Sequence, residues 1–273
     1  MQKYILASGC SYTDDNFTSL LYPDYDTSYD KWPSILGEKL ELPVKNIARS
    51  GVGNDYIFNK TVEDISQNHE NIELVVIGWT EAWRWCVFDY EYHNPMSAIM
   101  KKHKKRGGAG VQDYNVMSIP YYKHLFIDNL INSSPYKQSY LHRICAEDLF
   151  SKIITIQNLC KAFGIKIIMS TLCGCFNRSG MKTLLEALDM NSENYYYSVD
   201  STAIALMESK NFYDVDKSTI IGWPFVDLLG GFEFNFGILT EQLRIGEGDG
   251  HPNKKGHELI ADYYYEHYKK IYL

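Results

Sequence analysis

A serine near the start of the chain and a histidine near its end have the side chains needed for acyl chemistry. Ser11 follows the apolar run Tyr4 to Ala7 and the strand-breaking Gly9, so we expect its hydroxyl at the carboxyl end of a buried strand. His251 lies in a glycine-rich turn two residues after Asp249 and just before a predicted helix. A hydroxyl, an imidazole and a carboxylate can act as nucleophile, general base and the acid that orients the base. The alternative for Ser11 is that it caps the segment after the strand.

Five segments of the sequence are candidates for the strands that position these residues. The β-branched run from Ile72 to Gly78 is typical of a parallel strand that is buried on both faces. The other predicted strands are Tyr4 to Ala7, Leu42 to Ala48 and Ile165 to Thr171. Residues 218–229, interrupted by Pro224, form either a fifth strand or a buried loop.

Helical periodicity alternates with these strands. The spacing of apolar residues predicts helices over 31–40, 56–65, 141–163, 181–190, 195–210 and from 253 to near the end of the sequence. The alternation predicts an α/β protein with a flavodoxin-like, three-layer α/β/α architecture and a mostly parallel sheet of about five strands. In such a sheet ligands bind beyond the carboxyl ends of the strands, which places Ser11 in the crevice.

A long stretch after the third predicted strand has no strong element. We expect residues 1–273 to form one domain with a large insertion at about 86–140, which would act as a lid or as a partner surface. The insertion contains a basic run at 101–106. An exposed loop is favoured there over contact with an anionic ligand, because runs of like charge are generally solvated.

Composition excludes several classes of function. With 273 residues and 45% hydrophobic content, the chain can bury one full core. A net charge of −7 argues against a surface built to neutralise phosphates, so we expect no nucleic-acid partner. The sequence has no apolar run of membrane-spanning length and no recognisable leader, so neither a membrane partner nor a signal peptide is expected.

The six cysteines show no dense framework, which favours free thiols in a reducing compartment. Cys173 and Cys175 are separated by one residue but lack a companion pair at ligand spacing, so no metal site is predicted.

The order of the motifs along the chain resembles that of the SGNH (GDSL-like) hydrolase family. Gly9-Cys10-Ser11 stands where the family has Gly-Asp-Ser, and residues 46–54 match the second block with its asparagine and glycine. Residues 78–81 correspond to the third block, Gly-x-Asn-Asp, and residues 249–251 to the last, Asp-x-x-His, with one residue fewer. The Gly-Cys-Ser-Tyr-Thr form of the first block is similar to a variant in bacterial and phage SGNH-like proteins.

This resemblance implies a serine ester hydrolase that needs no cofactor, with Ser11, His251 and Asp249 as catalytic residues. The glycine before His251 frees the backbone, so the Asp249 carboxylate can bend back toward the imidazole despite the short spacing. If it does not, Glu247 or a backbone carbonyl would orient the imidazole instead. His257 lies on the last predicted helix and is interpreted as structural.

An oxyanion hole is predicted beside the serine. Two glycines next to Asn54 allow backbone amides to approach a substrate oxygen closely, although an ordinary strand-to-helix turn would have the same residues. The predicted donors are the amides of Ser11 and of Gly51 or Gly53, with Asn54 or Thr80 beside them. The family has an asparagine at the position of Thr80, so Thr80 substitutes for it, Asn54 replaces it, or the hole is incomplete.

Aromatic residues after the third strand suggest the substrate class. Trp79, Trp83 and Trp85, with Arg84, are predicted to line the crevice, where indole rings could stack on a sugar. The expected substrate is therefore a small ester or an acylated carbohydrate, and the expected location is cytoplasmic or virion-associated. The main alternative is an inactive SGNH-like fold that binds a glycan or another protein. A nucleotide binder is disfavoured, because the turn at 8–13 is too poor in glycine to cradle phosphates.

Overall fold

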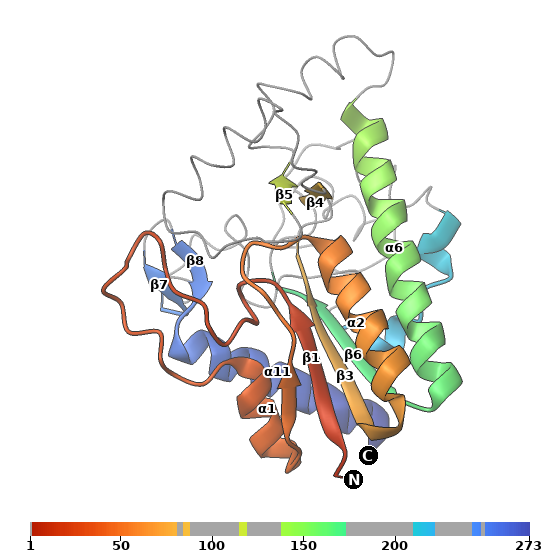
Figure 1. The fold of residues 1–273 in the computed structure, drawn as a ribbon, viewed down its shortest axis with the longest axis horizontal. Coiled ribbons are helices and arrows are strands. Elements are labelled where there is room, and N and C mark those ends of the chain that lie inside the picture. Colours follow the sequence, from red (N-terminus) through yellow and green to blue (C-terminus); the bar gives the residue numbers. More distant parts are fainter. Residues whose placement is uncertain are drawn as a thin grey trace, which may run out of the picture.

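A computed structural model describes residues 2–80, 84–87, 115–118, 138–172, 210–221, 242–246 and 249–273. Its centre is a parallel sheet of four strands in the order β2-β1-β3-β6 (Figure 1). The strands are β1 (Tyr4–Gly9), β2 (Val44–Asn46), β3 (Ile72–Trp79) and β6 (Lys166–Thr171). Both β1 and β3 are almost wholly buried, as expected for continuous apolar strands covered on both faces.

The predicted α/β fold is confirmed, with four strands in the described sheet instead of about five. At the place of the fifth strand, Ile220 makes a single parallel bridge to Met169 of β6. Just before it, residues 217–219 form the 3₁₀ turn η4 (Lys217–Thr219). Residues 222–241 lie outside the described residues.

Two pairs of helices cover the sheet, one pair on each face (Figure 1). On one face lie α2 (Asn54–Asn68) and α6 (Gln138–Phe163), and on the other lie α1 (Trp32–Leu40) and α11 (Lys254–Tyr272). In α2 the residues Ile57, Thr61 and Ile65 recur at helical spacing and are fully buried. In α11, Ile260 and Tyr264 are fully buried, whereas Tyr263 is 43% exposed. The predicted helix at 181–190 lies outside the described residues, as does that at 195–210 except for Lys210, which begins the 3₁₀ turn η3 (Lys210–Tyr213).

Contacts between α1 and α11 join the two ends of the sequence. The rings of Trp32 and Tyr264 are stacked with centroids 4.3 Å apart. Tyr264 also donates a hydrogen bond to the carbonyl of Ile77 in β3. Helix α11 is thereby fixed both to α1 and to the middle of the sheet.

The residues that lead into α11 form a short hairpin that the sequence did not predict. Strand β7 (Arg244–Gly246) pairs in antiparallel fashion with β8 (Asp249–Pro252). Asn253 joins this hairpin to the helix, because its side chain accepts from the Gly256 amide and donates to the carbonyls of Gln242 and Arg244.

Of the predicted insertion at 86–140, the structure describes the end of one strand, the whole of a second strand and the start of α6. Strands β4 (Arg84–Val87) and β5 (Asn115–Ser118) pair in antiparallel fashion. The remainder, including the basic run at 101–106, lies outside the described residues. The lid or partner surface therefore stays a prediction.

Candidate active site

Ser11 lies at the carboxyl end of β1, where the sheet order changes direction. Strand β1 has β2 on one side and β3 on the other, and ligands bind at such a switch point in doubly wound folds. After Gly9 the chain turns tightly, because the amides of Thr13 and Asp14 both donate to the carbonyl of Cys10, at 2.9 and 3.1 Å. Ser11 occupies this turn and is partly exposed.

The predicted serine and aspartate each lie within hydrogen-bond distance of the predicted histidine, at opposite nitrogens of its ring. Ser11 Oγ is 2.8 Å from Nε2 of His251, and Nδ1 of His251 is 2.6 Å from Oδ1 of Asp249. The short Asp-x-His spacing does not prevent this contact, because Oδ1 also accepts the backbone amide of His251 at 3.0 Å and so bends back over the turn. The predicted fallback Glu247 lies outside the described residues.

The environment of Asp249 favours its ionised form. Burial alone would raise the pKa of this carboxyl group, but hydrogen bonds from His251 and Ser19 outweigh it and lower the pKa to about 2. Asp249 is therefore charged at neutral pH. A carboxylate in this position holds the Nδ1 proton of the imidazole and leaves Nε2 free to accept a proton from Ser11.

Two aromatic rings flank the imidazole of His251. Phe17 is stacked on it, with ring centroids 4.1 Å apart and planes 24° apart. Tyr12 lies tilted against it at 4.9 Å. Both aromatic residues are buried, whereas the His251 side chain is 27% exposed. The contacts fix the plane of the imidazole while part of it remains open to solvent.

Sequence reasoning missed Ser19, whose hydroxyl donates to Oδ2 of Asp249. The Ser19 hydroxyl oxygen in turn accepts the Tyr22 amide at 2.9 Å. Both Ser19 and Asp249 are only 4% exposed. Because 230 residues separate them and the loop at 12–29 has no periodicity, no sequence signal indicated this pair.

The loop after β2, which contains the predicted oxyanion glycines, is fastened to the Ser11 turn. Asp14 Oδ2 accepts both the amide and the hydroxyl of Ser50, at 2.7 and 2.6 Å. The side chain of Asn46 donates to the carbonyl of Thr13 at 2.7 Å. These bonds hold the backbones of the two loops side by side.

Within this loop, Gly51 has a φ of +79°, a left-handed conformation that favours glycine. Gly53 precedes the first residue of α2. The part of both amides in an oxyanion hole stays a prediction.

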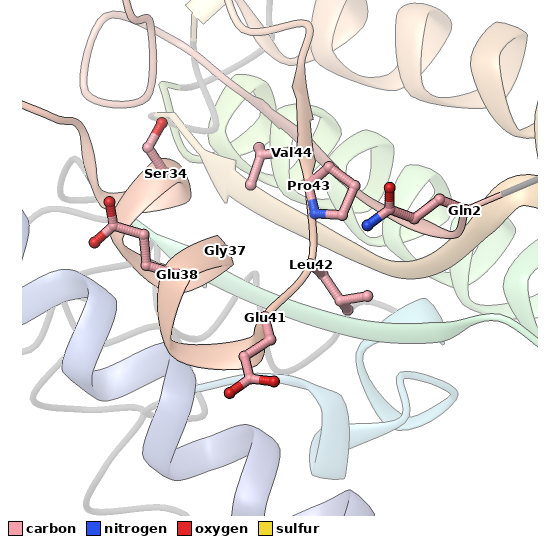
Figure 2. A pocket seen from close by; sticks show the side chains of 8 residues that line it. All are labelled: Gln2, Ser34, Gly37, Glu38, Glu41, Leu42, Pro43 and Val44. Atoms are coloured by element: carbon pink, nitrogen blue, oxygen red, sulfur yellow. The ribbon is translucent and has the colours of Figure 1, made fainter.

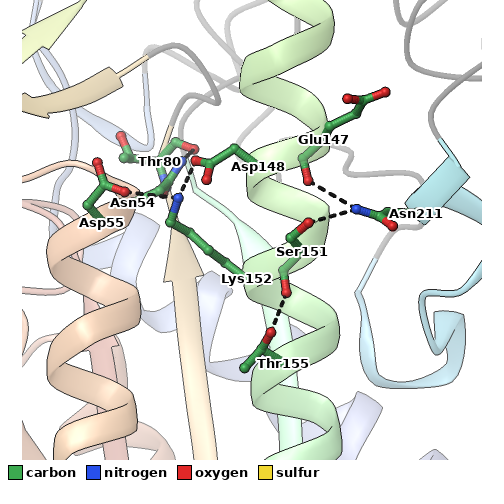
Figure 3. Close-up of polar contacts among 9 residues, drawn as sticks. All are labelled: Asn54, Asp55, Thr80, Glu147, Asp148, Ser151, Lys152, Thr155 and Asn211. Atoms are coloured by element: carbon green, nitrogen blue, oxygen red, sulfur yellow. Dashed lines mark hydrogen bonds and ion pairs between the residues drawn. The ribbon is translucent and has the colours of Figure 1, made fainter.

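Asn54 and Thr80 bind each other (Figure 3). The Asn54 side chain accepts the Thr80 amide at 3.1 Å and donates to the Thr80 carbonyl at 3.2 Å. Both residues are buried. Asn54 therefore joins the start of α2 to the end of β3, and a direct contact of either side chain with a substrate oxygen stays a prediction.

Beside this pair, Lys152 of α6 forms ion pairs with Asp148 and, at 2.9 Å, with Asp55 of α2 (Figure 3). Burial would lower the pKa of Lys152, but the two carboxylates outweigh it and raise the pKa. The charged lysine thus joins the two helices on this face of the sheet.

The prediction that Trp79 lines the substrate crevice is wrong. Its side chain is fully buried, and its indole N–H donates to the sulfur of Met169 on the neighbouring strand β6. Trp79 is the last residue of β3 and packs into the core. Trp83 lies outside the described residues, and Arg84 and Trp85 are described only as members of β4.

His257 is a structural residue, as predicted. Its ring is 2% exposed, and Nδ1 accepts the backbone amide of Trp32 at the start of α1. Burial, together with the charge of Lys31, lowers its pKa to about 3, so the ring is neutral and available as an acceptor.

A shallow hollow of about 450 Å³ lies at the other end of the sheet (Figure 2). Its lining includes Gln2 before β1 and Val44 at the start of β2, and two glutamates, Glu38 and Glu41. The hollow is remote from Ser11, because it lies at the amino end of β1 and Ser11 follows the carboxyl end of that strand. Its lining contains none of Ser11, His251 and Asp249.

Within the described ranges, no three His, Cys, Asp or Glu side chains gather in a way that would hold a metal ion. Cys173 and Cys175 are not among these residues. No helix that the structure describes combines the length and the apolar character needed to cross a membrane.

Comparisons with known proteins give likenesses in structure but none in sequence. No family model matches the chain, and no curated protein matches its sequence. The psychrotrophic esterase EstA from a Pseudoalteromonas species is 12% identical, with a TM-score of 0.45 over 98% of each chain.

Two further solved structures are similar at the same level. A Slackia heliotrinireducens protein assigned to the SGNH hydrolases is 16% identical, with a TM-score of 0.41 over 97% of this chain and 98% of that one. The α/β hydrolase LAE5, from the metagenome of Lake Arreo, is 10% identical, with a TM-score of 0.41 over 97% and 94%. The function proposed below therefore depends on the geometry of the site.

Proposed function

We propose that this protein is a serine hydrolase that cleaves small carboxylic esters, with Ser11 as nucleophile and His251 as general base. The observation that supports this most directly is the 2.8 Å separation of Ser11 Oγ and His251 Nε2, with Asp249 at the opposite nitrogen of the ring. Nucleophile, base and orienting acid thus lie in the order that acyl transfer needs.

In the first half of the reaction, His251 Nε2 takes the proton of Ser11 while Oγ attacks the ester carbonyl carbon. The resulting oxyanion is held by the amide of Ser11 and by that of Gly51 or Gly53, with Asn54 beside them. The imidazolium then gives its proton to the leaving alkoxide as the carbon–oxygen bond breaks. An alcohol departs and an acyl group stays on Ser11.

In the second half, His251 takes a proton from water, and the hydroxide attacks the acyl carbon. The bond to Oγ breaks, the proton returns to Ser11, and a carboxylic acid is released. Asp249 remains ionised throughout, because its low pKa keeps it a carboxylate next to the imidazolium.

The substrate class is proposed as small esters, acylated carbohydrates among them. The partly exposed His251 and Ser11 support access by a compact acyl group. The burial of Trp79 removes one of the rings expected to stack on a sugar. A panel of short p-nitrophenyl esters and O-acetylated sugars measures the preference directly.

A fluorophosphonate probe, which labels activated serines, tests the proposal. We expect labelling of Ser11 in the wild type, none in Ser11→Ala, and much slower labelling in His251→Ala. Ser34→Ala is the matched control, because Ser34 lines the hollow at the other end of the sheet (Figure 2) and should leave labelling unchanged. A folded wild-type protein that is neither labelled nor active on short p-nitrophenyl esters would refute the proposal.

A further inference from the structure

The two oxygens of the Asp249 carboxylate have different partners. Oδ1 accepts both of its hydrogen bonds from His251, one from the ring and one from the backbone. This double use of one oxygen follows from the short Asp-x-His spacing, which brings the amide and the ring of the same histidine to the same side of the carboxylate. Oδ2 is left facing the protein interior, because Asp249 is 4% exposed.

Ser19 supplies the hydrogen bond to Oδ2, through its hydroxyl. With a donor at each oxygen, the carboxylate cannot rotate without losing one of its bonds. Without Ser19, the buried Oδ2 would lack this donor, and the carboxylate would be more stable if it turned toward water or another hydrogen-bond donor. Such a turn would take Oδ1 away from Nδ1 of His251.

The segment that contains Ser19 is itself fastened to the β7–β8 hairpin. The backbone amide of Tyr22 donates to Ser19 Oγ. The ring of Tyr22 packs against Gly246 of β7, so closely that a Cβ added to Gly246 would lie 2.6 Å from Cζ of Tyr22. Farther along, the hydroxyl of Tyr29 donates to the carbonyl of Pro252 at 3.0 Å. Residues 19–29 thus contact both strands of the hairpin that contains Asp249 and His251.

We propose that Ser19 is a positioning residue, which fixes the Asp249 carboxylate so that His251 keeps the orientation needed to accept the Ser11 proton. This inference rests on the function proposed above and adds a residue to it. Ser19 contacts neither the substrate nor the reacting atoms and acts through Asp249 alone.

Three variants test the role of Ser19. Ser19→Ala removes the hydroxyl, Ser19→Thr keeps one, and Ser28→Ala is the matched control, because Ser28 lies in the same segment but binds the exposed Asp26. For a short p-nitrophenyl ester we expect Ser19→Ala to lower kcat about 10- to 100-fold, the effect of one hydrogen bond to a charged group, with KM almost unchanged. Ser19→Thr should recover most of this loss, and Ser28→Ala should match the wild type.

A second measurement needs no substrate. The proton shared by His251 Nδ1 and Asp249 should give a strongly downfield proton NMR resonance, present in the wild type and in Ser28→Ala and lost or shifted upfield in Ser19→Ala. An unchanged resonance together with a wild-type kcat in Ser19→Ala would overturn the inference. So would a Ser19→Thr variant that is as slow as Ser19→Ala.

The two measurements separate this inference from the proposed function. If the wild type turns over no ester, the proposed function fails, and the resonance still decides whether Ser19 orients the pair. If the wild type is active and Ser19→Ala equals it in both measurements, only the inference about Ser19 fails.

Discussion

Ser11 and His251 contact each other although 240 residues separate them in the sequence. Ser11 comes from the turn after β1, and His251 from β8, which runs directly into α11. The amide of Trp32 in α1 donates to His257 in α11, so the first and last helices are joined close to this contact. The geometry of the site therefore depends on how α11 packs against α1.

Asp249→Asn should strongly impair catalysis while the protein stays folded. An amide has only one acceptor oxygen, so it cannot accept from both His251 and Ser19 as the two oxygens of the carboxylate do, and it lacks the negative charge that stabilises the imidazolium. Its NH₂ group can also favour the wrong tautomer of the ring. We expect kcat for a short ester to fall about a thousand- to ten-thousand-fold. Equal kcat in variant and wild type would show that Asp249 does not orient His251.

The same variant should change the acid stability. The pKa of Asp249 is lowered to about 2 in the folded protein from 3.8, so its contribution to stability is complete above about pH 4 and is lost as the pH falls through about 2. Urea unfolding over this range should show a steeper loss of stability in the wild type than in Asp249→Asn.

His257→Asn should reduce the pH dependence of stability between about pH 3 and pH 6.5, mostly above the range in which Asp249 titrates. The pKa of His257 is lowered to about 3 from 6.5, so between these values the unfolded chain binds a proton that the folded protein does not. Its contribution is present above about pH 6.5 and is lost as the pH falls, by up to about 1.4 kcal/mol for each pH unit. Asparagine can accept the Trp32 amide without titrating.

Urea unfolding at several pH values between the two pKa values checks this prediction. The free energy of unfolding of the wild type should decrease more steeply than that of His257→Asn as the pH is lowered. Parallel curves for the two proteins would contradict the assignment of a buried, neutral imidazole at this position.

Gly9→Ala should disturb the turn that holds Ser11. A Cβ at residue 9 would lie 2.2 Å from Oγ1 of Thr13 and 3.1 Å from the carbonyl oxygen of Gly78. Thr13 would have to move, and its hydroxyl is already fixed by the indole N–H of Trp32 at 3.3 Å. We expect a loss of about 1–3 kcal/mol in the free energy of unfolding, together with slower fluorophosphonate labelling.

Gly164→Ala serves as the control for that variant. Gly164 has a φ of +67° and no heavy atom within 4 Å of its added Cβ, so alanine there costs backbone strain without touching the Ser11 turn. Melting temperature and labelling rate should fall together in Gly9→Ala, whereas only the melting temperature should fall in Gly164→Ala. Unchanged labelling in Gly9→Ala would show that the turn tolerates the displacement.

Strands β1, β3 and β6 were predictable because each contains a run of at least three consecutive apolar residues. The predictions for β1, β3 and β6 differ from the structure by one or two residues at their ends. The β7–β8 hairpin was missed, since its strands are short and contain glycine, arginine and aspartate, so no alternation is visible. Hairpins of this kind are fixed by tertiary contacts such as those of Asn253.

The candidate site also contains parts that the sequence predicts and parts that it does not. The expected contact of Ser11 with His251 is present, because strand ends and glycine turns limit where such side chains can lie. Ser19 could not be predicted, because its partner is distant and its loop has no pattern. Trp79 was placed wrongly: an aromatic residue at a strand end fits a ligand surface or the core equally well by sequence, and the neighbouring Met169 decides for the core.

The long sequence separation between β1 and β8 has a consequence during synthesis. Ser11 is translated 240 residues before His251, whose imidazole would activate it under the function proposed above. Until then the serine is an ordinary alcohol. If the proposed function holds, the nascent polypeptide would be inert toward esters and would become reactive only once β8 has been translated and α11 has docked.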